Sequence, residues 1–173
     1  EDSDIRLLSP VESKGYIDLT IQVLEAFGVE IETTSTGYHI PGKQIFQSPS
    51  VIDAEGDWSN GGFLLCAGAL GKGIVINGLQ RESLQKDKGI LPILREFGVN
   101  VAVQTDESGR ESVHVIPSNM SAIDIEGADI PDLIPAIAVV AAYADGVSRF
   151  RNVGRLRIKE SDRIEAIGKL LAA

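Results

Sequence analysis

The stretch REFGVNV, residues 95–101, has a counterpart in EAFGVEI, residues 25–31. In both stretches a helical pattern stops at a glycine, and a strand-like pattern follows. A second matching pair, VIDAEG at 51–56 and AIDIEG at 122–127, marks the expected start of a strand. The members of each pair are about 70 residues apart, a period somewhat longer than that of most solenoid repeats. The sequence therefore predicts one supersecondary unit that recurs along the chain.

The complete copy of this unit is predicted at residues 51–117, with the order β-α-β-α-β-β. Its strands are expected at 51–55, 74–79, 99–104 and 111–116, and its helices from Asp57 or Ser59 to about Leu70 and at about 90–97. Residues 1–50 carry the second half of another copy, and residues 118–173 carry the first half of a third.

The two partial copies are predicted in the same way. Residues 1–50 are expected to form a loose segment at 1–10, a helix at 16–27, strands at 29–34 and 38–40, and a linker at 41–50. Residues 118–173 are expected to form strands at 122–127 and 146–153 and helices at 131–144 and from Asp162. We therefore predict an α/β (α+β) fragment of a larger repeat-built protein, truncated at both ends. A self-contained protein with partial repeats is the alternative.

The composition excludes several classes of protein. The 173 residues include 16 Lys and Arg against 25 Asp and Glu, a formal charge of −9, which argues against a general nucleic-acid binder and against an anionic membrane surface. The longest apolar run, residues 133–144, is shorter than the roughly 20 residues that span a bilayer. The acidic start, residues 1–10, does not have the pattern of a secretory signal. A single cysteine, Cys66, excludes an internal disulfide and is expected in the core, so we predict a cytoplasmic protein.

One stretch reverses the sign of this charge. RFRNVGRLRIKESDR, residues 149–163, contains six cations, and a helix is predicted to follow it with Asp162 as its cap. Lys159, Glu160 and Arg163 would then cluster where a loop meets a helix N-terminus. Backbone N–H groups and the positive end of the helix dipole favour anions at such a place.

A carboxylate precedes the other helix of the same unit. Asp129 is a plausible cap for that helix, and Pro131 suits its first turn. Taken alone, Asp132 would be a partner of the helix dipole. In a β-α-β-α layer, however, both helices begin at the same edge of the sheet. We therefore expect Asp132 to share one pocket with Lys159 and Arg163.

Other polar residues were weighed as ligand-binding or metal-binding groups. Ser13, Lys14 and Tyr16 lie at the start of the first predicted helix, where they suit a phosphate or sugar-like hydroxyls, although Ser13 alone reads as a simple cap. His39 and His114 lie in strand patterns, where we expect no partner carboxylate nearby and structural roles for both. The spacing of Cys and His fits no metal site, and we expect neither a metal nor a cofactor.

Several stretches resemble one enzyme family. RLRIKESDRIEAI, residues 155–167, resembles the C-terminal signature of the 3-phosphoshikimate 1-carboxyvinyltransferases, or EPSP synthases. The resemblance covers nearly the whole chain, because three further segments occur in the family's order and spacing: SKGYIDLTIQVLEAFGVEIE at 13–32, AEGDWSNGGFLL at 54–65 and DIPDLIPAIAVVAA at 129–142. It implies the enolpyruvyl transferase fold, an inside-out α/β barrel of two domains with three β-α-β-α-β-β units each. Residues 1–50 would then end the first domain and cross over, and residues 51–173 would be part of the second.

The resemblance also implies an activity and its residues. Members transfer the enolpyruvyl group of phosphoenolpyruvate to shikimate 3-phosphate and release phosphate, in the shikimate pathway of aromatic amino acid biosynthesis. Asp132 would accept a proton and contact the shikimate hydroxyls, and Glu160 would handle protons at the methylene carbon. The remaining substrate ligands would be Ser13 and Tyr16 near the shikimate phosphate, Lys159 on that phosphate, and Arg163 on phosphoenolpyruvate.

Some of the family's pattern is missing from these residues. Arg155 stands where some members have an asparagine that binds shikimate phosphate, which leaves its role open. An N-terminal lysine, a first-domain arginine, and a distal arginine and lysine have no counterpart, so we expect the fragment alone to be inactive. One alternative is a UDP-N-acetylglucosamine enolpyruvyl transferase, which would be expected to lack KESDR (159–163). A non-catalytic, repeat-built scaffold is another. The full-length protein is expected to be a monomer.

Overall fold

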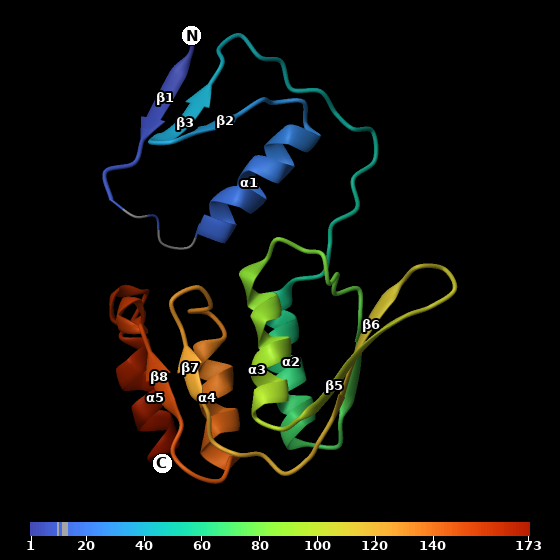
Figure 1. Cartoon of the computed structure of the whole chain (residues 1–173), viewed down its shortest axis with the longest axis vertical. Helices are drawn as coiled ribbons and strands as arrows, with labels where there is room; N and C mark the ends of the chain where they lie inside the picture. The colour runs from blue at the N-terminus through green and yellow to red at the C-terminus, as the bar shows by residue number, and fades with distance from the viewer. Residues whose placement is uncertain (10, 12–13) are drawn as a thin grey trace. The chain divides into compact units, whose positions relative to one another are not determined.

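The computed structural model describes residues 1–9, 11 and 14–173, which form two compact units, Glu1–Ala54 and Glu55–Ala173 (Figure 1). The first unit has one sheet and the second has two, and each unit is described here by itself. Among the described residues, no helix is both long enough and apolar enough to pass through a lipid bilayer.

The first unit is one helix on a three-stranded sheet. Its elements are β1 (Ser3–Arg6), α1 (Lys14–Ala26), β2 (Glu32–Thr34) and β3 (Gly37–Ile40). The sheet order is β1-β3-β2, and both pairs are antiparallel. The prediction that residues 1–10 are loose is wrong for β1. This strand is polar and short, and its hydrogen bonds go to β3, more than thirty residues away, so no local pattern marks it.

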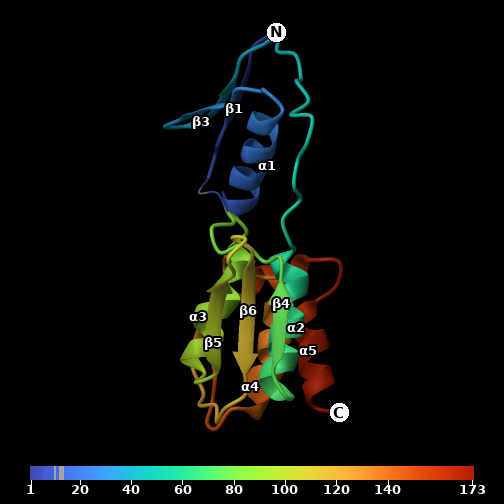
Figure 2. The same ribbon diagram turned by 90° about the vertical axis from the view of Figure 1, so that its right-hand side faces the viewer.

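The second unit begins with a helix and a sheet of the same design. Its elements are α2 (Trp58–Leu70), β4 (Ile74–Asn77), the 3₁₀ helix η1 (Lys86–Gly89), α3 (Ile90–Glu96), β5 (Asn100–Thr105) and β6 (Glu111–Ile116). The sheet order is β4-β6-β5, antiparallel throughout, and Figure 2 shows these strands side by side with the helices on one face. Asp57, one of the two predicted caps, caps α2 by accepting hydrogen bonds from the N–H groups of Ser59 and Asn60.

One strand that was predicted for the complete copy, residues 51–117, does not form. Residues 51–55 have no strand conformation, and Val51 and Ile52 are exposed. Just after this segment, the Gly56 N–H donates to the Gly78 carbonyl, which follows β4. An alternating sequence is not enough for a strand, because the backbone must also find a partner.

The rest of the second unit pairs two strands with two helices. Its elements are β7 (Asp124–Glu126), α4 (Ile134–Tyr143), β8 (Arg149–Arg151), the 3₁₀ helix η2 (Gly154–Ile158) and α5 (Arg163–Leu171). β7 and β8 are parallel. The predicted cap at Asp129 is wrong, because the N-cap of α4 is Leu133. Turns precede that helix, with the Ile130 N–H donating to the Gly127 carbonyl and the Leu133 N–H to the Ile130 carbonyl.

The core of the second unit is built around α2 and α4. Both helices are apolar on most faces, as expected of helices buried on several sides. α2 contacts β4, β6, α3 and α4, so it lies between the sheet and the second helix pair. Gly62 lets α4's cap residue approach, since a Cβ on Gly62 would lie 2.3 Å from the Leu133 side chain. Apolar helices inside and strands outside are the features expected of an inside-out α/β arrangement.

Candidate functional site

Two helices of the second unit begin beside each other because their strands are parallel. β7 leads into the turns before α4, and β8 leads through η2 into α5. Asp132 lies in the last of those turns, and Arg163 is the first residue of α5. Elements that follow neighbouring parallel strands start at the same edge of a sheet. The fold therefore brings together two side chains that are 31 positions apart in sequence.

Arg163 is the centre of the cluster. Its Nη1 donates to Asp132 Oδ1 at 2.7 Å, and its Nε and Nη2 donate to the two oxygens of Glu160 at 2.8 and 3.0 Å. Lys159 Nζ lies 3.7 Å from the same Asp132 oxygen. The side chains of Asp132, Lys159 and Arg163 are about 22 to 32% exposed, whereas Glu160 is 65% exposed. We name these four residues the Asp132–Arg163 cluster.

The contacts within the cluster fix its charge state. The hydrogen bond from the Arg163 guanidinium, assisted by its positive charge and that of Lys159, lowers the pKa of Glu160. The same bond, together with the one to Asp132, raises the pKa of Arg163 above its already high value. Glu160 is therefore an anion at neutral pH while Arg163 holds it, and the cluster contains two cations and two carboxylates.

A supporting layer that sequence reasoning missed holds the loop before α5. Leu156, in η2, is fully buried, which anchors the loop to the core. Arg157 donates to Asp162 Oδ2 at 2.8 Å, while Asp162 Oδ1 accepts from the Glu165 N–H at 3.0 Å. Asp162 thus caps α5, as predicted, and also binds the loop. The sequence signal for η2 was the apolar Leu156, which stands among cationic residues.

The surplus of positive charge expected at residues 149–163 is largely neutralised. Arg151 contacts Asp124 at 2.7 Å, and Arg149 lies 3.7 Å from the same carboxylate, across the parallel strand pair. Arg149 and Arg151 therefore link β8 to β7. They lie at the opposite end of residues 149–163 from Arg163. Within residues 149–163, the cations that lie beside Asp132 are Lys159 and Arg163.

Two of the predicted site residues, Ser13 and Tyr16, belong to the first unit. Ser13 lies outside the described residues. Tyr16, in the first turn of α1, is 44% exposed and lines an apolar pocket within the first unit. Lys14 at the same helix start pairs with Asp18 at 2.6 Å, one turn on.

Two further predictions concern buried or histidine side chains. Cys66 lies in the core, as predicted, and burial raises the pKa of its thiol to about 12. The expectation that His39 has no partner carboxylate is wrong, because β1 brings Asp4 Oδ1 to 2.8 Å from its Nδ1. Among the residues that the structure describes, no three His, Cys, Asp or Glu side chains are grouped to hold a metal ion.

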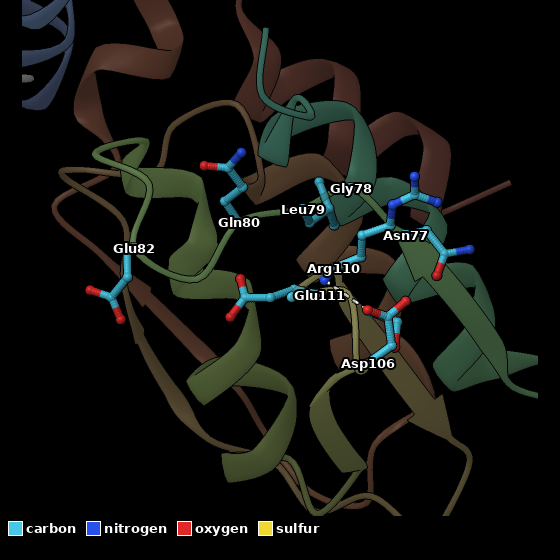
Figure 3. A pocket seen from close by; sticks show the side chains of 10 residues that line it. Asn77, Gly78, Leu79, Gln80, Glu82, Asp106, Arg110 and Glu111 are labelled. Carbon is cyan, nitrogen blue, oxygen red and sulfur yellow. Dashed lines mark hydrogen bonds between the residues drawn. The ribbon is translucent and has the colours of Figure 1, made fainter. Parts of the chain in front are cut away.

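The second unit also has an open pocket of about 770 Å³ away from the cluster (Figure 3). It lies between the end of β4 and the turn that joins β5 to β6, and none of the predicted site residues lines it. Asp106 holds that turn by accepting hydrogen bonds from Ser108 and from the Arg110 N–H. Glu111 accepts from the Arg81 N–H at 2.6 Å. The carboxylates of Asp106 and Glu111 in the pocket wall are thus engaged in local structure.

Comparison with solved structures defines the class of fold. The chain superposes on an EPSP synthase from Acinetobacter baumannii with a TM-score of 0.77, covering 97% of this chain and 38% of that one at 22% identity. It also superposes on the enolpyruvyl transferase NikO from Streptomyces tendae with a TM-score of 0.57, covering 92% and 39% of the two chains at 18% identity. The fold is that of the enolpyruvyl transferases, as the resemblance implied.

Sequence comparison gives the family. Residues 1–172 match the family EPSP synthase (3-phosphoshikimate 1-carboxyvinyltransferase), and the chain belongs to it. A 3-phosphoshikimate 1-carboxyvinyltransferase of Methanocaldococcus jannaschii is 38% identical over 167 residues, which is 96% of this chain and 38% of the relative. Relatives of the same name from Clostridium novyi and Archaeoglobus fulgidus are 39 and 40% identical over 172 residues, or 99% of this chain. The chain spans about 38 to 40% of the length of these relatives.

Proposed function

We propose that this chain is part of an enzyme that transfers the enolpyruvyl group of phosphoenolpyruvate to shikimate 3-phosphate. The Asp132–Arg163 cluster is the observation that carries the proposal. It combines a carboxylate in the turn before a helix, a second carboxylate and two cations within hydrogen-bonding or ion-pairing reach of one another. A reaction between two anions that also moves protons needs these groups side by side.

The first step of the transfer requires a base for the hydroxyl proton and cations that bind the anionic substrates. The acceptor hydroxyl oxygen bonds to C2 of phosphoenolpyruvate, its proton passes to a base, and C3 gains a proton to become a methyl group. We assign the base to Asp132, which the turn before α4 holds in place. Its Oδ1 accepts from Arg163 in the free chain. A bound carboxylate or phosphate would compete for Arg163 and release that oxygen to the hydroxyl.

The second proton transfer is assigned to Glu160. In the free chain Arg163 binds both oxygens of Glu160 and lowers its pKa, which suits a proton acceptor rather than a donor. When Arg163 turns to a ligand anion, the pKa of Glu160 rises, so the carboxylate takes up a proton from solvent and gives it to C3. It then takes a proton back from C3 as the C–O bond to phosphate breaks, and the proton held by Asp132 passes to the leaving phosphate. The net products are 5-enolpyruvylshikimate 3-phosphate and phosphate.

The charge balance of the cluster supports a further part of the proposal. Its two cations are matched by its two carboxylates, so the cluster alone has no surplus charge for two phosphates and a carboxylate. The family's further cations, an N-terminal lysine, a first-domain arginine, and a distal arginine and lysine, have no counterpart in these 173 residues. We therefore propose that these 173 residues alone do not turn over the substrates.

The position within the complete protein follows from the same family pattern. We assign residues 1–50 to the end of the first domain and its crossover. Residues 51–117 would be one full unit of the second domain, and residues 118–173 a truncated one. The complete protein would act as a monomer, in the cytoplasm, in aromatic amino acid biosynthesis.

A chimera tests the function with the residues in place. This chain replaces the matched 38% of the Methanocaldococcus jannaschii relative, and phosphate release from phosphoenolpyruvate and shikimate 3-phosphate is measured. We expect activity in the chimera, and a loss of about 10²- to 10⁴-fold in Asp132→Asn and Glu160→Gln, the range for removing a general acid or base. Arg163→Lys should raise KM for phosphoenolpyruvate. Arg149→Lys, a cation outside the cluster, should stay within about twofold.

The same assay separates the alternatives. If UDP-N-acetylglucosamine and not shikimate 3-phosphate supports phosphate release, shikimate 3-phosphate is the wrong acceptor. The proposal of enolpyruvyl transfer would still hold. If the chimera is active and Asp132→Asn, Glu160→Gln and Arg163→Lys change nothing, this part of the protein is a scaffold and the cluster is not the catalytic centre. Turnover by the 173 residues alone would contradict the charge argument.

A further inference from the structure

The second unit contains two Asn–Gly dipeptides, Asn60–Gly61 and Asn77–Gly78. An asparagine followed by glycine can react within its own backbone. The nitrogen of the glycine attacks the side-chain amide carbon of the asparagine, and a cyclic succinimide forms. Glycine favours this attack because it has no side chain and few limits on its backbone angles. The two dipeptides share this chemistry, so the fold around each one decides whether it reacts.

The dipeptide Asn60–Gly61 is held by the first turns of α2. The Gly61 N–H donates to the Asp57 carbonyl at 2.9 Å, and the Asn60 Nδ2 donates to Asp57 Oδ2 at 2.6 Å. Gly61 is buried, and a Cβ on it would lie 2.8 Å from a methyl carbon of Leu79. Both reacting groups are therefore bonded to Asp57, and the glycine is tightly packed.

The dipeptide Asn77–Gly78 has the opposite surroundings, at the point where β4 ends. Both residues are exposed, and both line the open pocket of Figure 3. The Gly78 N–H donates to the Glu111 carbonyl at 3.3 Å, which is long for a hydrogen bond. Gly78 has a φ of +87°, and a Cβ on it would have no atom of the described residues within 4 Å beyond its chain neighbours. The attacking nitrogen is therefore weakly bonded and has open space around it.

We propose that Asn77 is a site of spontaneous deamidation, with water as the co-reactant. The Gly78 nitrogen bonds to Asn77 Cγ, and the side-chain nitrogen leaves as ammonia together with the Gly78 proton. Water then opens the succinimide. Attack at Cγ gives aspartate, and attack at the Asn77 backbone carbonyl carbon gives isoaspartate, whose main chain runs through Cγ. This modification site is independent of the proposed transferase reaction.

Both products change the charge of the open pocket. Its lining includes three carboxylates, Glu82, Asp106 and Glu111, and one cation, Arg110. Deamidation replaces the neutral amide of Asn77 with a fourth carboxylate. The pocket wall therefore becomes more negative with either product.

Isoaspartate also lengthens the backbone just before Gly78. The Gly78 carbonyl accepts from the Gly56 N–H at 3.0 Å, and a Cβ on Gly56 would lie 2.5 Å from that carbonyl oxygen. The two backbones are thus in close contact. Gly56 is the second residue of the second unit, which begins at Glu55. We expect isoaspartate, but not aspartate, to weaken the hydrogen bond that holds the start of this unit to the end of β4.

Peptide mapping of the aged chain tests the site. The chain is incubated in mildly alkaline buffer, and mass spectrometry follows the replacement of NH2 by OH at each asparagine. We expect Asn77 to react at least about tenfold faster than Asn60, because reaction at Gly61 requires local opening of a buried helix turn. The two rates should converge in concentrated urea. Fluorescence of the buried Trp58 verifies that the chain is folded in the first buffer.

Two substitutions separate the effect of charge from that of the backbone. Asn77→Asp introduces the carboxylate with an unchanged main chain. Asn77→Gln keeps an amide one methylene farther from the backbone, which disfavours ring closure, so it should block the modification. Amide exchange of Gly56 should be about tenfold faster in the isoaspartate form than in fresh protein, and within about twofold of fresh protein in Asn77→Asp.

Three results would contradict the proposal. Equal rates at Asn77 and Asn60 in the folded chain, or no reaction at Asn77 there, would overturn the site. Ammonia release that is as fast in Asn77→Gln as in the unchanged chain would place the reaction elsewhere. An isoaspartate form with unchanged exchange at Gly56 would overturn the proposed effect on the start of the second unit.

Discussion

The two sheets β1-β3-β2 and β4-β6-β5 are the same structure in different surroundings. Each is antiparallel, each follows the same register, and each is covered by a helix that ends just before the sequence FGV. The second sheet has α2 and α4 behind it and a continuous apolar core. The first has one helix, and among its apolar residues only Val29 and Tyr38 are buried, as far as the structure describes that unit.

This difference separates what local sequence determines from what neighbours determine. The repeat specifies helix, turn and strand in both units, because capping, glycine stops and side-chain alternation act within a few residues. The depth of burial depends on elements from elsewhere in the chain. Stability should therefore be unequal at positions where the sequences agree, and substitutions at matched positions measure that inequality.

The matched phenylalanines give the largest expected difference. Phe97 is 1% exposed, whereas Phe27, at the same place in the repeat, is only partly buried. Phe97→Ala should destabilise the second unit by about 3–5 kcal/mol, the cost of deleting a buried aromatic side chain. Phe27→Ala should cost the first unit clearly less, because water already reaches the ring.

Separate probes report on the two units. Trp58 is the only tryptophan and is fully buried, so its fluorescence in urea follows the second unit. Amide exchange of β2 and β3 follows the first. Equal losses for the two phenylalanines would mean that the exposed face of the first unit is closed in solution.

A polar clamp in the second unit gives the next largest effect. The Gln85 side chain accepts from the Trp58 N–H at 2.8 Å and donates to the Gly56 carbonyl at 2.9 Å and to Glu55 at 3.0 Å. It satisfies one of the free N–H groups at the start of α2. The repeat places Gly15 at this position in the first unit, so no such clamp exists there.

Gln85→Ala should therefore destabilise the second unit by about 1–3 kcal/mol, the usual cost of leaving buried or partly buried polar groups without partners. Urea unfolding followed by Trp58 fluorescence measures it. Gln80→Ala is the control, because only its backbone carbonyl, and not its side chain, accepts from Trp58 Nε1. If both variants lose the same free energy of unfolding, the loss comes from truncating a surface side chain. The hydrogen bonds of Gln85 would then contribute nothing specific.

Sequence reasoning succeeded where signals were local or repeated. The repeat and its helices followed from the two FGV stretches, and the cap at Asp162 followed from its spacing to Glu165. The common edge shared by Asp132 and Arg163 followed from the β-α-β-α order, because parallel strands leave little choice of arrangement. The function of these residues rests on the family resemblance and stays a prediction until it is tested.

The failures were long-range. Residues 51–55 alternate like a strand but find no partner, and β1 forms from a segment that looked loose because β3 provides its hydrogen bonds. The neutral charge of the cluster was also missed, since the carboxylates that pair with each arginine come from both near and distant positions. Missing β1 led directly to missing the partner of His39.

The two sheets place a histidine at the same register position in different surroundings, which yields the smallest predicted effect. His39 lies between Asp4 of β1 and Glu32 of β2, whereas His114 lies between Val75 and Ala102. The hydrogen bond that the His39 ring donates to Asp4, helped by nearby negative charge, raises the pKa of His39 above its ordinary value of 6.5. Protonated His39 therefore holds β1 more strongly than the neutral ring does.

The sign of the pH dependence follows from that shift. A group whose pKa is raised by folding contributes stability below its unfolded pKa, and the contribution is lost as pH rises through the folded pKa. Amide exchange in β1 should therefore be slower at pH 5.5 than at pH 8 after correction for intrinsic rates, and Asp4→Asn should remove most of the difference. The same substitution should leave the ring resonances of His114 and the exchange of β4 unchanged. If the pH effect on amide exchange in β1 persists in Asp4→Asn, it comes from groups other than the His39–Asp4 pair. That pair would then not account for the difference between the first sheet and the second.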